Sequence, residues 1–277
     1  MMYYFIGIRE PGMLSLALFM KELGYEISCN EKEKIEGADN LFSKTTIDEN
    51  MKIIKGEFVD DDNEEIKEAK NKNLRTYTYS ELINILIEKH KTIIVIESNK
   101  YLLSSTLSSV LNEISTCNCL IAGRKVIAVK RQEYLVLSIN FLQFKEKMNN
   151  AKYSILSNKF EPLDSQVEDY HDFLNKTDKI ILAYGDKKNS KEIDLIKPIF
   201  LYGLEKDNDI TIQNLEKSTL GYVFDVTIED NYYGHFDLPL SKKEDIVDVL
   251  ATITICYYER FAAKDVSKAL KKVLKKT

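Results

Sequence analysis

The chain has 277 residues, of which 44% are hydrophobic and 30% charged, a length and balance typical of a folded protein with two domains. Its 39 Lys and Arg against 44 Asp and Glu leave a net charge of −5, which argues against a nucleic-acid binder because phosphate neutralisation needs a basic surface. No apolar run approaches the roughly 20 residues of a membrane-spanning helix, so we expect no membrane span.

The opening segment predicts the first unit of a dinucleotide-binding fold. Residues 3–8 form an apolar run typical of a buried strand, and Gly7 and Gly12 bracket a tight turn after it. Residues 13–23 repeat apolar side chains at helical spacing, and residues 25–29 follow as a second strand. Strand, glycine turn, helix and strand is the order in which such a fold begins.

Further elements predict a second α/β series that starts near residue 90. Before that point the acidic run at 60–65 precedes a helix, and a strand at 75–78 precedes a helix at 79–89. The later pattern predicts helices over 102–113 and 165–175 and strands at 92–97, 119–122, 126–129, 134–139, 153–156 and 179–183. Beyond Pro198 we expect an antiparallel meander (210–213, 221–228, 232–238) and two closing helices (242–259, 263–276).

Several of these segments resemble the Mur ligases. The run Phe5-Ile6-Gly7-Ile8-Arg9-Glu10-Pro11-Gly12-Met13 is similar to the strand and G-I-x-G-x-G-M turn that open the UDP-N-acetylmuramate–L-alanine ligases, with Glu10 and Pro11 as departures. Residues 62–70 resemble a D-N-P-E-I…A segment of that family, and residues 200–203 resemble a strand that ends in T-Y-G. Residues 264–273 resemble the helix that closes the family's central domain. The resemblance covers the chain in order, although only the N-terminal motif is specific.

The resemblance implies an α/β fold of two doubly wound domains. Residues 1–89 would form a Rossmann-like domain of the UDP-sugar-binding type, and residues 90–277 a domain like the family's central ATPase, a P-loop-type fold with an antiparallel meander. The family's C-terminal ligase domain, which binds the incoming amino acid, is expected to be absent. The family uses ATP and magnesium to activate a carboxylate as an acyl phosphate, which an amine then attacks.

The family's phosphate loop is degenerate in this sequence. Where the family has G-x-x-G-K-T-T, this chain has Glu97-Ser98-Asn99-Lys100, and no glycine lies between positions 56 and 123. Glycines are needed because backbone N–H groups must approach phosphate oxygens closely, which a Cβ obstructs. Glu97 would also place a carboxylate near the triphosphate, and Lys100 is interpreted as an exposed turn lysine.

The family's magnesium ligands are replaced as well. The strand that ends in E-A-D-E in the family corresponds to residues 134–140, where Ser138 and Asn140 are neutral. The T-N-x-x-x-D-H-L-D segment corresponds to residues 157–164, which contain no histidine. We therefore expect no metal site, no bound cofactor and no catalytic residue.

A candidate UDP-sugar site remains at the first glycine turn. The helix that begins near Gly12 presents free N–H groups to a diphosphate, and Arg9 adds a charge-assisted donor. Glu31 follows the second strand, where an acidic residue can meet a ribose. The candidate residues are Gly7, Ile8, Arg9, Gly12, Met13, Ser28 and Glu31. The alternative is a generic strand-to-helix turn in which Arg9 pairs with Glu10.

The sequence therefore predicts a Mur ligase-like protein without ATP-dependent ligase activity. It would bind a UDP-sugar, a protein partner or a second copy of itself, in peptidoglycan precursor metabolism. One alternative is an atypical UDP-N-acetylmuramate–L-alanine ligase completed by another chain, and another is a purely structural scaffold. The N-terminus lacks the features of a signal peptide and the 4 cysteines lack metal-ligand spacing, so we expect reduced thiols in a cytoplasmic protein.

Overall fold

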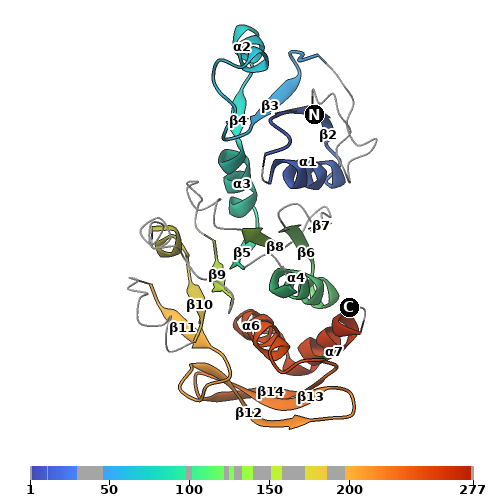
Figure 1. Ribbon diagram of the computed structural model, residues 1–277, viewed down its shortest axis with the longest axis vertical. Helices are drawn as coiled ribbons and strands as arrows, with labels where there is room; N and C mark the ends of the chain where they lie inside the picture. Colours follow the sequence, from blue (N-terminus) through green and yellow to red (C-terminus); the bar gives the residue numbers. More distant parts are fainter. Residues whose placement is uncertain are drawn as a thin grey trace.

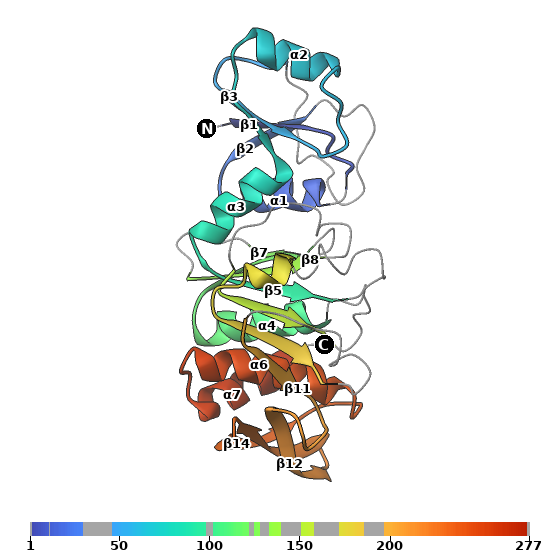
Figure 2. The same ribbon diagram turned by 90° about the vertical axis from the view of Figure 1, so that its left-hand side faces the viewer.

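The computed structural model describes residues 2–10, 12–29, 46–97, 102–121, 125–127, 133–139, 151–157, 172–185 and 197–275. The strands of these residues form two sheets, shown in Figures 1 and 2. The small sheet has 4 strands in the order β2-β1-β3-β4, and the large sheet has 10 in the order β14-β13-β12-β11-β10-β9-β5-β8-β6-β7. The predicted α/β class is confirmed.

The small sheet is parallel throughout. Its strands are β1 (Met2–Ile6), β2 (Glu26–Cys29), β3 (Met51–Lys55) and β4 (Thr76–Thr78). Strand β3, which pairs with both β1 and β4, was not among the predicted strands, because its five residues include two lysines and give a weak apolar signal. The parallel pairing brings the turn after β1 and the loop after β3 to one edge of the sheet.

Helices cover both faces of the small sheet. Alternation along β1 sends Tyr3 and Phe5 to one face and Tyr4 and Ile6 to the other, and all four side chains are buried. The first face packs against α1 (Met13–Glu22) and α3 (Tyr79–Glu88), and the second against α2 (Glu64–Asn71).

Helix α3 carries the chain from the small sheet to the large one. A reciprocal capping box fixes its start: Glu81 N donates to Thr78 Oγ1 at 3.2 Å, and Thr78 N donates to Glu81 Oε2 at 2.8 Å. Helices α1 and α3 lie between the two sheets in both views (Figures 1 and 2). Their apolar side chains share one core with Ile94 and Leu135 of the large sheet. The division into domains near residue 90 stays a prediction, with the change of sheet falling across α3.

The large sheet combines a parallel part with the predicted antiparallel meander. The parallel strands are β6 (Cys117–Ile121), β8 (Tyr134–Ile139), β5 (Lys91–Ile96), β9 (Tyr153–Leu156), β10 (Ile180–Tyr184) and β11 (Ile199–Tyr202). The meander is β12 (Ile210–Lys217), β13 (Tyr222–Ile228) and β14 (Asn231–Leu238), and β7 (Lys125–Ile127) runs antiparallel to β6. Strand β12 joins β11 by a parallel pairing.

Three helices pack on the face of the large sheet that is turned away from α1 and α3. They are α4 (Leu102–Ile114), α6 (Asp245–Tyr258) and α7 (Ala263–Leu274). Every residue of α6 from Ile246 to Cys256 is buried, which makes it the central helix of this layer. The predicted helix at 165–175 falls within the described residues only at 172–175, which are helical. None of the described helices is both long enough and apolar enough to cross a membrane.

Candidate functional site

The carboxyl ends of parallel strands are the usual place for ligands in α/β folds. Two such places in the described residues correspond to the sequence motifs: the turn from β1 to α1 in the small sheet, and the end of β5 at Glu97 with the start of α4 in the large sheet. Each carries a glutamate: Glu10 stands where the Mur ligase motif has glycine, and Glu97 lies within the stretch that corresponds to the family's phosphate loop.

Glu97 follows β5 and its carboxyl group caps the start of α4. Its Oε2 accepts a hydrogen bond from Leu103 N at 3.2 Å, and its Oε1 accepts one from Ser104 N at 3.3 Å. The hydroxyl of Ser104 also donates to Oε1, as does the hydroxyl of Ser138 on β8 at 3.1 Å. Two amides in the first turn of α4 therefore already have a hydrogen-bond acceptor from the chain itself.

The surroundings of Glu97 oppose its ionisation. The side chain is 7% exposed, and this burial raises its pKa. Hydrogen bonds from Ser104 and Ser138 act in the opposite direction, and nearby Asp248 on α6 raises the pKa further. The four donated hydrogen bonds satisfy the buried carboxyl group without a cation.

The structure brings together two positions that the sequence marked separately. Strands β5 and β8 are neighbours, and Val95 pairs with Ser138, so the Ser138 hydroxyl lies beside the end of β5. Among the described residues no group of three or more His, Cys, Asp or Glu side chains could hold a metal ion. Ser98, Asn99, Lys100 and Asn140 lie outside the described residues.

The glycine turn after β1 has the backbone form expected of it. Gly7 and Gly12 have φ angles of 79° and 85°, in the left-handed region that favours glycine. Glu10 N donates to Gly7 O at 3.0 Å, and Met13 N donates to Glu10 O at 3.1 Å, which closes the turn at the start of α1.

The side chain of Glu10 folds back over this turn toward the loop after β3. Its Oε2 accepts a hydrogen bond from Phe58 N at 3.1 Å. Gly7 and Gly56 wall the space that the carboxyl group fills: a Cβ added to Gly7 would lie 2.9 Å from Glu10 Oε1, and one added to Gly56 would lie 2.6 Å from it. Gly56 N donates to Ile6 O at 2.9 Å and ties the two loops together.

The other candidate ligand residues lie around this turn in different environments. Ile8 and Met13 pack into the core between the sheets, with 3% and 1% of their surface exposed, and Ser28 is fully buried on β2. Arg9 is exposed at the turn. Glu31 lies outside the described residues. Gly7, Gly12 and Arg9 therefore form the accessible part of the predicted set.

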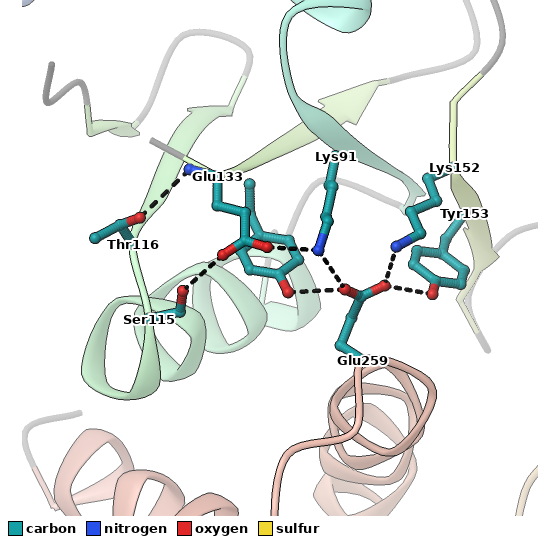
Figure 3. A network of polar contacts seen from close by, with 8 residues as sticks. Lys91, Ser115, Thr116, Glu133, Lys152, Tyr153 and Glu259 are labelled. Atoms are coloured by element: carbon teal, nitrogen blue, oxygen red, sulfur yellow. Dashed lines mark hydrogen bonds and ion pairs between the residues drawn. The ribbon is translucent and has the colours of Figure 1, made fainter. Parts of the chain in front are cut away.

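A third polar cluster, which the sequence did not predict, lies at the opposite edge of the large sheet (Figure 3). Glu259, which caps the end of α6, accepts hydrogen bonds from the amino ends of strands β5, β8 and β9. The donors are Lys152 Nζ and Tyr153 Oη, both at 2.5 Å, Tyr134 Oη at 2.8 Å and Lys91 Nζ at 3.3 Å. Lys91 Nζ also bonds to Glu133 Oε1 at 2.5 Å.

We call Glu259 and its four donors the clasp, because their hydrogen bonds and ion pairs tie the end of α6 to the large sheet. Burial alone would raise the pKa of Glu259, but hydrogen bonds from Lys152, Tyr153 and Tyr134 lower it to about 2. Burial raises the pKa of both tyrosines, and Glu259 raises it further. Glu259 thus stays ionised at neutral pH and links α6 to three strands. No local motif marks it, because its donors lie 106 to 168 residues away in sequence.

The chain was compared with known proteins to find the family that it resembles in sequence. No family model matches the chain. The UDP-N-acetylmuramate–L-alanine ligase of Ligilactobacillus salivarius is 26% identical over 286 residues, covering 97% of this chain and 65% of that protein. The enzyme of the same name from Lactiplantibacillus plantarum is 27% identical, covering 97% of this chain and 66% of that protein. The chain thus spans slightly less than two thirds of the length of these relatives.

Solved structures with the same fold are also Mur ligases. A UDP-N-acetylmuramate:L-alanyl-γ-D-glutamyl-meso-diaminopimelate ligase from Neisseria meningitides has a TM-score of 0.73 and 15% identity, covering 98% of this chain and 97% of that one. A UDP-N-acetylmuramate–alanine ligase from Thermotoga maritima has a TM-score of 0.69 and 17% identity, covering 99% of this chain and 68% of that one.

The chain is therefore a homologue of the Mur ligases, with a fold that matches them across both sheets. This confirms the resemblance that the sequence motifs indicated. The two curated relatives named above, at 26–27% identity, are UDP-N-acetylmuramate–L-alanine ligases.

Proposed function

We propose that this chain is a Mur ligase homologue that binds a UDP-sugar at the turn after β1 and does not carry out ATP-driven ligation. The observation that supports the loss of ligation is the Glu97 carboxyl group, which occupies the helix start where the family motif cradles phosphate. The wider role would be a binding module in peptidoglycan precursor metabolism, acting alone or with a protein partner.

ATP with magnesium does not fit the described part of the β5 turn. Leu103 N and Ser104 N, which would otherwise be free to meet a phosphate, already donate to Glu97. A phosphate oxygen would have to displace the buried Glu97 carboxyl group from these two amides before it could accept their hydrogen bonds. Ser138 offers a neutral hydroxyl where the family has a magnesium-binding carboxylate, and that hydroxyl donates to Glu97.

The turn after β1 is better suited to a ligand than the start of α4. Gly7 and Gly12 keep the left-handed backbone that lets a strand pass directly into a helix, and Arg9 is exposed beside them. The relatives that match 97% of this chain are named for a UDP-sugar substrate, UDP-N-acetylmuramate. We infer that the same class of ligand binds here.

The proposal is tested by offering the chain the complete ligation mixture. UDP-N-acetylmuramate, L-alanine, ATP and magnesium are incubated with the wild-type chain and with Lys100→Ala, and phosphate release and amide formation are followed. We expect no turnover above the protein-free background for either chain, and calorimetric binding of UDP-N-acetylmuramate to both. Phosphate release by the wild-type chain that disappears in Lys100→Ala would show a working phosphate loop and contradict the loss of ligation.

A further inference from the structure

We propose that Glu10 is a displaceable carboxylate that closes the ligand hollow of the small sheet, and that a diphosphate ligand enters only when this side chain turns outward. The inference rests on the proposed UDP-sugar binding at this turn. By the hollow we mean the space that the Glu10 carboxyl group now fills between the turn after β1 and the loop after β3, beside Gly7 and Gly56. The parallel pairing of Ile6 with Lys55 holds these two segments side by side.

The two glycines of the hollow serve different purposes. Gly7 has a left-handed φ of 79°, so its backbone conformation alone accounts for a glycine. Gly56 has no positive φ, and any L residue could adopt its backbone. What a side chain at position 56 would meet is the carboxyl group of Glu10, with Oε1 2.6 Å from the added Cβ. The absence of a side chain at Gly56 therefore serves to leave room for an anionic group between the loops.

The hollow also offers that group a hydrogen-bond donor. Phe58 N points into it and donates to Glu10 Oε2 at 3.1 Å. A backbone amide at the carboxyl edge of parallel strands is the kind of donor that binds a phosphate oxygen. Glu10 thus makes the contact that a ligand's diphosphate would make, and the two compete for the same place.

Glu10 can leave the hollow because its side chain is partly exposed and accepts a hydrogen bond only from Phe58 N among the described contacts. Glu10 is half-buried, whereas Glu97 in the other turn is 7% exposed and accepts four hydrogen bonds, two of them from serine hydroxyls. Withdrawing Glu97 would break all four contacts inside the protein. When Glu10 turns outward, its carboxylate loses the hydrogen bond from Phe58 N and forms hydrogen bonds with water instead. Glu97 is therefore held at the start of α4, whereas Glu10 can leave its place between the loops.

The test compares ligands with and without a diphosphate on matched variants. UDP and uridine are titrated calorimetrically into the wild-type chain, Glu10→Ala, Glu10→Gln and the control Glu57→Ala. Glu57 is an exposed carboxylate on the loop after β3, next to Gly56 and Phe58, where it accepts a hydrogen bond from Ser80. Thermal unfolding of each variant establishes that it is folded.

Removing the competing carboxylate should tighten UDP binding about tenfold in Glu10→Ala, which matches the loss of one charged hydrogen-bond competitor. Glu10→Gln should show a smaller gain, because its amide still fills the space. Glu57→Ala should not change UDP binding, and uridine, which has no phosphate, should bind all four chains alike. Glu10→Ala could also bind UDP when the wild-type chain does not. That result would support the role of Glu10 as a gate, meaning a side chain that blocks the ligand's place, but it would contradict ligand binding by the wild-type chain.

Two results would overturn the inference, and they separate it from the proposed function. If the wild-type chain binds UDP and Glu10→Ala binds it no more tightly, Glu10 is not a gate, although the UDP-sugar proposal stands. If neither the wild-type chain nor any Glu10 variant binds UDP, the gate and the UDP-sugar proposal both fail.

Discussion

Replacing Glu259 by glutamine tests the clasp at the amino edge of the large sheet. The substitution keeps the shape of the side chain and removes the charge that faces Lys152 and Lys91. Lowering the pKa of a carboxyl group from its ordinary 4.5 to about 2 corresponds to roughly 3 kcal/mol of preference for the ionised form in the folded chain. This agrees with the ~3–5 kcal/mol typical of breaking a buried ion pair from one side.

The free energy of unfolding of the wild-type chain and Glu259→Gln should therefore differ by about 3 kcal/mol at pH 7, measured by urea unfolding. The pKa of Glu259 is lower in the folded chain than in the unfolded one, so the stabilisation is complete above pH 4.5. It is lost as the pH falls from there toward about 2. The difference between the two chains should shrink over that interval.

Glu133→Gln is the matched control for this prediction. Glu133 bonds to the same Lys91 at 2.5 Å, but its side chain is 47% exposed, against 4% for Glu259. An exposed pair of this kind contributes about 0–1 kcal/mol. A Glu259→Gln effect as small as that of Glu133→Gln, or one that stays constant from pH 7 down to pH 2.5, would refute the reasoning.

Three further substitutions test other parts of the fold, each by the midpoint and slope of urea unfolding. Glu97→Ala should destabilise the chain by about 1–3 kcal/mol, because two amides and two hydroxyls lose their buried acceptor; an unchanged midpoint would contradict the described bonding. Gly234→Ala should cost about 1–3 kcal/mol, since the added Cβ would lie 2.5 Å from Ala263 Cβ and push α7 away from β14; a stabilised variant would argue against that close contact. Thr78→Ala removes the cap of α3 and should cost about 1 kcal/mol, whereas Thr78→Ser should retain most of the stability.

Much of the chain was predictable because local patterns specify its elements. Apolar spacing in α1 and the two left-handed glycines around the first turn were sufficient to predict the opening unit. Strand β3 was missed because Lys52 and Lys55 interrupt a short run whose burial depends on neighbours on both sides. Strand β12 runs further than predicted, past a register shift after Gln213, through residues that are largely exposed and polar.

The candidate sites depend on contacts that a single sequence does not show. The sequence marked Glu97 and Ser138 as departures from the family pattern, but their hydrogen bond follows from the placement of β5 beside β8. Glu259 meets strands more than 100 residues away and has no local signal. Glu10 appeared in the sequence as a replaced glycine, and only the loop after β3, with Gly56 and Phe58, explains where its carboxyl group lies.

The central claim is that this Mur ligase homologue keeps a UDP-sugar site without an ATP site, and a direct binding measurement tests it. Calorimetric titrations of the wild-type chain with magnesium-ATP and with UDP-N-acetylmuramate, under the same conditions, compare the two turns. We predict saturable binding of the UDP-sugar and no binding heat with magnesium-ATP. Saturable binding of magnesium-ATP would contradict the account, because it would require Glu97 to give up the amides at the start of α4.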